Sequence, residues 1–156
     1  MLYEELTSKI IAAFYEVHKT LGFGFLEQVY QNALYLELKD RGLKCECQKD
    51  LNVYYKNKIV GTYRTDMIVE DAIILELKAV SALRPEHEWQ LVNYLKGTNL
   101  QVGLLLNFGL RAEMKRKILA AVFWAVTATS AFTGTDLILA AEKTERLLCK
   151  SRIWRA

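Results

Sequence analysis

The segment AIILELKAV, residues 72–80, is apolar at every position except Glu76 and Lys78. A short apolar run without glycine or proline predicts a β-strand that is covered on both faces. Charges in such a strand lose much of their hydration free energy unless a partner compensates them. Side chains at i and i+2 lie on one face of a strand, roughly 6.5 Å apart, so Glu76 and Lys78 share one space. That space is either solvent or a polar site.

Two amphipathic helices are predicted before this strand. Apolar residues recur at three- and four-residue spacing over residues 2–21 and again over residues 26–41. Gly22 and Gly42 follow the two periodic segments, and glycine at these places is typical of a helix end.

Strands and a third helix are predicted from residue 44 onwards. Three β-rich runs, 44–55, 58–69 and 72–80, are joined by short polar segments, which indicates an antiparallel meander. A third amphipathic helix is predicted from Pro85 to the glycine at position 97, followed by one more buried strand over residues 101–108. The order of elements up to this point is ααβββαβ.

The C-terminal part of the sequence is harder to interpret. Residues 111–119, RAEMKRKIL, are basic and favour a helix. Residues 120–156 combine an apolar, threonine-rich stretch with a polar amphipathic end, which leaves open a helix broken at Gly134 or a strand followed by a helix. We therefore expect a domain over residues 1–119 and a C-terminal extension over residues 120–156.

Composition sets broad limits on class and location. The chain has 156 residues, of which 52% are hydrophobic and 25% charged, as in an ordinary globular domain. A net charge of +3 is compatible with a nucleic-acid partner without requiring one. The three cysteines suggest neither a disulfide framework nor a zinc site. The acidic N-terminus is unlike a signal peptide, and no apolar run approaches the roughly 18 residues of a membrane span, so we expect a cytoplasmic protein without a membrane partner.

A second carboxylate, Asp66, precedes the charged strand and is joined to it through the turn at Glu70 and Asp71. A two-residue turn would place Asp66 opposite position 75 and on the face away from Glu76. A three-residue loop or a β-bulge would place Asp66 opposite Glu76 and on the same face. The two carboxylates can therefore act together only if the hairpin contains such an irregularity.

Asp66, Glu76 and Lys78 on one face would place two carboxylates beside one ammonium. Two neighbouring carboxylates repel each other, and a hard divalent cation such as Mg²⁺ removes the conflict. A bound Mg²⁺ polarises a phosphate oxygen and acidifies water, while the lysine can orient the water or stabilise developing charge. This combination indicates phosphodiester hydrolysis.

These residues resemble the D…ExK motif of the PD-(D/E)XK nuclease superfamily. The resemblance implies a restriction-endonuclease-like α/β core of order αβββαβ, here with an extra N-terminal helix, and a mixed central sheet flanked by helices. It also implies Mg²⁺ as the cofactor, with Mn²⁺ as a substitute, and a nucleic-acid substrate, DNA being favoured over RNA.

The segment EVHKTLGFGFLEQVYQNAL resembles the motif of the GxxExxY proteins, a group within that superfamily, with Gly24, Glu27 and Tyr30 at the motif positions. Gln90 and Tyr94 match the QxxxY motif of RecB-like nucleases. These resemblances imply that Glu27 assists at the metal site and that Gln90 and Tyr94 support it. Without them, Glu27 could simply complement the helix dipole. The resemblance ends near residue 119 and assigns nothing to residues 120–156.

Three further basic features of the sequence could contribute to the site. His18 is expected to bond a backbone carbonyl rather than to act in catalysis. His87 is a weak candidate for contact with a substrate phosphate. The cluster RAEMKRK, residues 111–117, is the first place to look for binding of the nucleic-acid backbone.

The sequence thus predicts a metal-dependent nuclease that hydrolyses DNA or RNA. Asp66 and Glu76 bind the metal ion, and Lys78 acts on the water. The alternative is a catalytically silent module that binds nucleic acid or protein and retains the nuclease fold. A toxin, immunity or scaffold role carried by the C-terminal extension is a third hypothesis. A homodimer is compatible with the apolar stretch of that extension, which could pack against a second copy.

Overall fold

A computed structural model defines the structure of residues 3–119. The predicted C-terminal extension, residues 120–156, and the alternatives given for its structure lie outside the described residues. The described part contains three helices and seven strands. They are α1 (Glu4–Leu21), α2 (Glu27–Asp40), β1 (Cys45–Cys47), β2 (Asp50–Tyr55), β3 (Lys58–Arg64), β4 (Met67–Val69), β5 (Ile73–Lys78), α3 (Pro85–Lys96), β6 (Val102–Phe108) and β7 (Ala112–Ile118).

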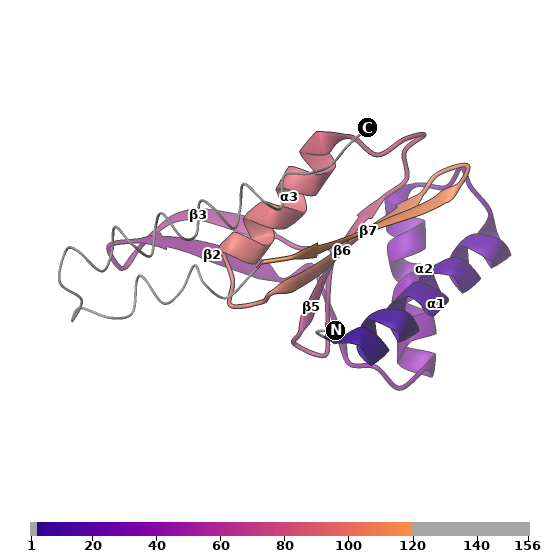
Figure 1. Ribbon diagram of the computed structural model, residues 1–156, viewed down its shortest axis with the longest axis horizontal. Helices are drawn as coiled ribbons and strands as arrows, with labels where there is room; N and C mark the ends of the chain where they lie inside the picture. Colours follow the sequence, from indigo (N-terminus) through magenta and orange to yellow (C-terminus); the bar gives the residue numbers. More distant parts are fainter. Residues whose placement is uncertain (1–2, 120–156) are drawn as a thin grey trace, which may run out of the picture. The chain divides into compact units, whose positions relative to one another are not determined.

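A five-stranded sheet of order β1-β4-β5-β6-β7 forms the centre of the described part (Figure 1). β5 pairs with β6 in parallel, whereas the β1–β4, β4–β5 and β6–β7 pairs are antiparallel. The parallel pair requires a crossover, and α3 supplies it. The prediction of a mixed α/β fold with a mixed central sheet and flanking helices is confirmed.

Helices cover both faces of the sheet. Ile73, Leu75 and Leu77 of β5 pack in one apolar cluster with buried residues of α1 and α2. Ile74 packs in a second cluster with Leu91 and Leu95 of α3. Because side chains alternate along a strand, the positions two and four residues after Ile74 lie on the α3 face of the sheet.

The two predicted strands 44–55 and 58–69 are each divided in the structure. Their antiparallel register stays in step through the break, since Cys47 pairs with Met67 and Asp50 with Arg64. The inner halves, β1 and β4, belong to the central sheet, whereas β2 and β3 form a separate two-stranded sheet, called the arm below. Figure 1 shows the arm extending away from the central sheet beside α3.

The prediction of a helix over residues 111–119 is wrong, because Ala112–Ile118 form strand β7. β7 pairs along the whole of β6 and so satisfies the backbone groups at that edge of the buried strand. Met114 contacts the core on one face, while Lys115 and Lys117 on the other face form ion pairs with Glu88 of α3. Core-facing and α3-facing side chains therefore alternate along β7 with the two-residue period of a strand. The many basic residues of this segment obscured that period in the sequence.

No helix within residues 3–119 is long and apolar enough to cross a membrane.

Candidate active site

The charged pair of β5 is almost completely buried on the α3 face. Lys78 Nζ lies 2.5 Å from Glu76 Oε1, and the two side chains are 13% and 2% exposed, respectively. The other oxygen, Glu76 Oε2, is buried and has no hydrogen-bond partner among the described residues. A buried carboxylate oxygen without a donor is costly, which makes this atom a candidate ligand for a cation.

The β4–β5 connection has the three residues that the shared-face arrangement requires. Val69 pairs with Ile73, which leaves residues 70–72 in the loop. Glu70 and Asp71 have positive φ values of 52° and 51°, and Ala72 N donates to Val69 O at 3.0 Å. The register continues to place Asp66 across from Glu76.

The carboxylate of Asp66 reaches the charged strand directly. Asp66 Oδ2 accepts a hydrogen bond of 2.7 Å from the backbone N–H of Leu77, the residue between Glu76 and Lys78. Burial raises the pKa of Asp66 above its ordinary value, against the lowering effects of the Leu77 N–H and the Lys78 ammonium.

Glu27, the first residue of α2, joins the same group. Burial raises the pKa of Glu27; the nearby Lys78 ammonium opposes the rise, the Asp66 carboxylate adds to it, and a hydrogen bond from the Ala79 backbone opposes it. The N-terminus of a helix favours a carboxylate at this position, so α2 also stabilises its charge.

The pKa values of Glu76 and Lys78 are both raised. Burial raises the pKa of Glu76 to about 7, and the Asp66 carboxylate adds to the rise, while Lys78 opposes it. Burial lowers the pKa of Lys78, but the Glu76, Glu27 and Asp66 carboxylates outweigh burial and raise it above its ordinary value. Lys78 is therefore held in its cationic form.

Gln90 and Tyr94 lie one turn apart on α3, above these charges. Gln90 Nε2 donates to Tyr94 Oη at 2.8 Å. Burial raises the pKa of Tyr94, Gln90 opposes the rise, and the Glu76 and Asp66 carboxylates add to it. The structure thus brings the six predicted site residues into one region. They are Glu27, Asp66, Glu76, Lys78, Gln90 and Tyr94.

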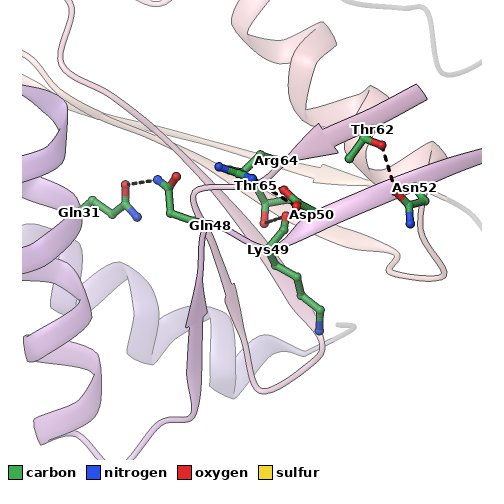
Figure 2. Close-up of polar contacts among 8 residues, drawn as sticks. All are labelled: Gln31, Gln48, Lys49, Asp50, Asn52, Thr62, Arg64 and Thr65. Atoms are coloured by element: carbon green, nitrogen blue, oxygen red, sulfur yellow. Dashed lines mark hydrogen bonds and ion pairs between the residues drawn. The ribbon is translucent and has the colours of Figure 1, made fainter. Parts of the chain in front are cut away.

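Sequence reasoning missed Gln31, which holds the backbone of Asp66. Gln31 is buried on α2, and its Nε2 donates to Asp66 O at 3.1 Å. Its Oε1 accepts a hydrogen bond of 3.1 Å from Gln48 Nε2, at the point where the strand pair leaves the central sheet (Figure 2). Gln31 follows Glu27 by one helical turn, and this i,i+4 spacing is the signal that could have identified it.

Two further positions fix the C-terminal end of β5. The Asn107 side chain accepts from Val80 N at 3.0 Å and donates to Val80 O at 2.9 Å. A Cβ atom at Gly109 would lie 2.2 Å from Val80 O, so this close approach requires glycine. His18 Nε2 lies 2.8 Å from Gly109 O, as expected for a histidine bonded to a backbone carbonyl.

The remaining candidate residues have structural partners. Tyr30 of the GxxExxY motif is buried, and its hydroxyl donates to Gly22 O at 2.8 Å, which closes the turn between α1 and α2. His87 Nδ1 accepts the Arg84 N–H at 3.1 Å, at the N-terminus of α3. In the RAEMKRK cluster, Lys115 and Lys117 pair with Glu88.

The side chains of the site supply few ligands for a divalent cation. Within residues 3–119, no group of three or more His, Cys, Asp and Glu side chains is arranged to hold a metal ion. Mg²⁺, however, is commonly bound by one or two carboxylates, with water and substrate phosphate as the other ligands. Asp66 and Glu76 match that smaller requirement, because Glu76 Oε2 has no hydrogen-bond partner in the described part of the chain.

A sequence model described as the PD-(D/E)XK nuclease superfamily matches residues 4–118. The chain belongs to this superfamily. Solved structures that are similar to this PD-(D/E)XK protein include the following two. One is SSO0001, with 18% sequence identity and a TM-score of 0.49 over 93% of this chain and 68% of that chain. The other is an alkaline exonuclease (LHK-Exo) from Laribacter hongkongensis, with 15% identity and a TM-score of 0.46 over 80% and 70% of the two chains. No curated protein matches the sequence. The narrower resemblance to the GxxExxY group stays a prediction.

Proposed function

We propose that this PD-(D/E)XK protein is a Mg²⁺-dependent nuclease that hydrolyses phosphodiester bonds of DNA or RNA, with Mn²⁺ as a substitute ion. The observation that carries the proposal is the buried group formed by Asp66, Glu76 and Lys78, in which Glu76 Oε2 has no protein donor among the described residues. Burial of these charges costs desolvation free energy, and an ion held between the two carboxylates would offset that cost.

Each residue of the group has a distinct proposed role. Asp66 and Glu76 would hold the ion, and Glu27, whose pKa responds to both Asp66 and Lys78, would assist from the start of α2. The bound ion supplies Lewis acidity, which polarises a phosphate oxygen and lowers the pKa of water.

Lys78 is proposed to act as a cation. Because the neighbouring carboxylates raise its pKa above the ordinary value, Lys78 remains protonated near neutral pH. A protonated lysine can orient the attacking water and stabilise the negative charge that develops on the phosphate. Gln90 and Tyr94, hydrogen-bonded to each other on α3, would position the substrate or the lysine.

Cleavage assays with the 156-residue chain test the proposal. Purified protein with Mg²⁺ or Mn²⁺ is expected to cut single- or double-stranded DNA or RNA. Glu76→Ala and Lys78→Ala are each expected to reduce the rate at least about a hundredfold, since removal of one electrostatic stabiliser costs roughly this much.

The exposed ion pair between Glu5 and Lys9 on α1, 2.9 Å long, provides the matched control. Glu5→Ala and Lys9→Ala are expected to leave cleavage unchanged, because this pair lies in the helical layer on the other face of the sheet. Cleavage that survives both Glu76→Ala and Lys78→Ala would contradict the assignment. Absence of cleavage by the unmodified chain on all four substrates would favour the silent binding module instead.

A further inference from the structure

A groove of about 430 Å³ lies between α3 and the arm, beside the candidate active site. Six side chains line it, one from β3 and five from α3: Tyr63, Glu86, Trp89, Gln90, Asn93 and Tyr94. The roles proposed for Asp66, Glu76 and Lys78 make no use of this space. Its volume falls within the range of small-molecule sites, roughly 300–1,000 Å³.

Aromatic rings dominate the groove. The rings of Tyr63 and Tyr94 lie 5.6 Å apart at an angle of 53°, so the arm and α3 meet through these two side chains. Trp89 is 63% exposed, although a tryptophan is usually largely buried. The groove therefore presents ring faces to solvent, together with the amides of Gln90 and Asn93.

The groove is continuous with the candidate active site through two shared residues. Gln90 and Tyr94 line the groove and are also the α3 residues predicted to support the site, and they are hydrogen-bonded to each other. The charges of Glu76 and Asp66 raise the pKa of Tyr94, so this end of the groove lies within electrostatic reach of the two carboxylates that would hold an ion at the scissile phosphate. A nucleotide adjacent to that phosphate could extend into the groove without a large change in the protein.

The chemistry of the lining favours a neutral ring over a phosphate. None of the six lining residues is cationic, and Glu86 would repel a phosphate. Aromatic faces stack on nucleobases, and side-chain amides can bond the edges of bases that have left a helical stack.

We propose that this groove binds an unstacked nucleobase next to the scissile phosphate, so that the preferred substrate is a single strand or an unpaired end. This inference rests on the proposed function, because it names the substrate class of the same site. In an intact duplex the bases are stacked and paired, and occupation of the groove would require unstacking.

The inference predicts that aromatic residues of the groove control binding of single strands. The variants Trp89→Ala and Tyr63→Ala of the 156-residue chain are titrated without divalent ions and at fixed salt. The two ligands are a labelled single strand of about twelve nucleotides and a duplex closed by hairpins at both ends. Each substitution is expected to weaken single-strand binding at least about fivefold, the effect of losing one base–aromatic contact. Binding of the closed duplex should change less than about twofold.

Two further variants control for indirect effects. Trp89→Phe keeps a ring face and is expected to retain most of the affinity. Tyr15→Ala removes a half-exposed aromatic from α1 and should leave the affinity unchanged. Equal unfolding profiles of these variants and the unmodified chain show that the fold is kept.

The outcomes separate this inference from the proposed function. Unchanged single-strand affinity in Trp89→Ala and Tyr63→Ala would overturn the inference, even if the chain cuts nucleic acid and the nuclease proposal stands. Equal losses for the single strand and the closed duplex would overturn it as well. So would an absence of oligonucleotide binding by the unmodified chain, the result expected if the groove takes a protein segment. Binding that depends on Trp89 in a chain that never cuts would support the groove and overturn the nuclease.

Discussion

Glu76 is both the costliest charge to bury in the candidate site and a proposed ligand of the metal ion. Its side chain is 2% exposed, is paired on one oxygen with Lys78 and is without a partner on the other among the described residues. Burial and the Asp66 carboxylate make the ionised form unfavourable in the folded protein. An apolar residue at this position would cost less free energy on folding, so we attribute the presence of a carboxylate to the proposed binding of an ion.

The first prediction at this scale concerns pH. Folding raises the pKa of Glu76 from 4.5 to about 7, so the folded state binds this proton more tightly than the unfolded state. The contribution of Glu76 to stability is therefore present below pH 4.5 and is lost as the pH rises to about 7. The loss amounts to about 3 kcal/mol at most.

Urea unfolding of the metal-free protein at pH 5 and pH 8 measures this effect. The free energy of unfolding should fall less with pH in Glu76→Gln than in the unmodified chain, because glutamine does not titrate. Glu16→Gln, at an exposed position of α1, should follow the unmodified chain. Parallel pH profiles for Glu76→Gln and the unmodified chain would show that the pKa of Glu76 is not raised.

The sequence reveals the charges of Glu76 and Lys78 because they interrupt an apolar run. Gln31 and Asn107 bind backbone groups of Asp66 and Val80, and nothing in their local sequence marks the segments that they contact. Such residues become visible only when the strands are placed beside each other. The i,i+4 relation between Glu27 and Gln31 is the exception.

At the scale of elements, the turns decide which residues meet. The three-residue connection between β4 and β5 places Asp66 on the side of Glu76, and this requirement could be stated from the sequence in advance. The division of the hairpin into central strands and arm could not, because the pairing register stays unchanged through the bend. The strand β7 was missed because its exposed face is basic, which obscured the period-two pattern.

A second prediction concerns the close contact between the C-terminal ends of β5 and β6. Gly109→Ala would place a Cβ atom 2.2 Å from Val80 O, and the backbone atom cannot move aside without shifting the end of β5. We expect a loss of about 1–3 kcal/mol in the free energy of unfolding, with reduced cleavage, because Lys78 and the Ala79 N–H lie on this segment.

Gly61→Ala is the matched control for this junction. A Cβ atom there meets nothing within 4 Å among residues 3–119, and the residue lies in β3 of the arm. Urea unfolding and cleavage assays should show little change in this variant. Equal effects of the two substitutions would mean that the contact between Gly109 and Val80 does not set the position of the β5 end.

At the scale of the whole described domain, one face of the central sheet carries most of the apolar core and the other face carries the candidate active site. The apolar cluster under α1 and α2 contains most of the large buried side chains, whereas the α3 face combines a smaller cluster with the charged group. Burial periodicity made the mixed α/β class predictable. The two-residue period of a strand predicted that Glu76 and Lys78 share one face. The family resemblance added Glu27, Gln90 and Tyr94 to the site.

Ion binding by the Asp66 and Glu76 carboxylates is the central claim, and calorimetric titration of the 156-residue chain with Mn²⁺ tests it most directly. We expect one binding event that weakens at least about tenfold in both Asp66→Asn and Glu76→Gln, because each variant removes one charged ligand. Glu5→Gln, whose side chain is 86% exposed, should bind Mn²⁺ as the unmodified chain does. Mn²⁺ binding that is absent from the unmodified chain, or equally strong in the Asp66 and Glu76 variants, would contradict the claim.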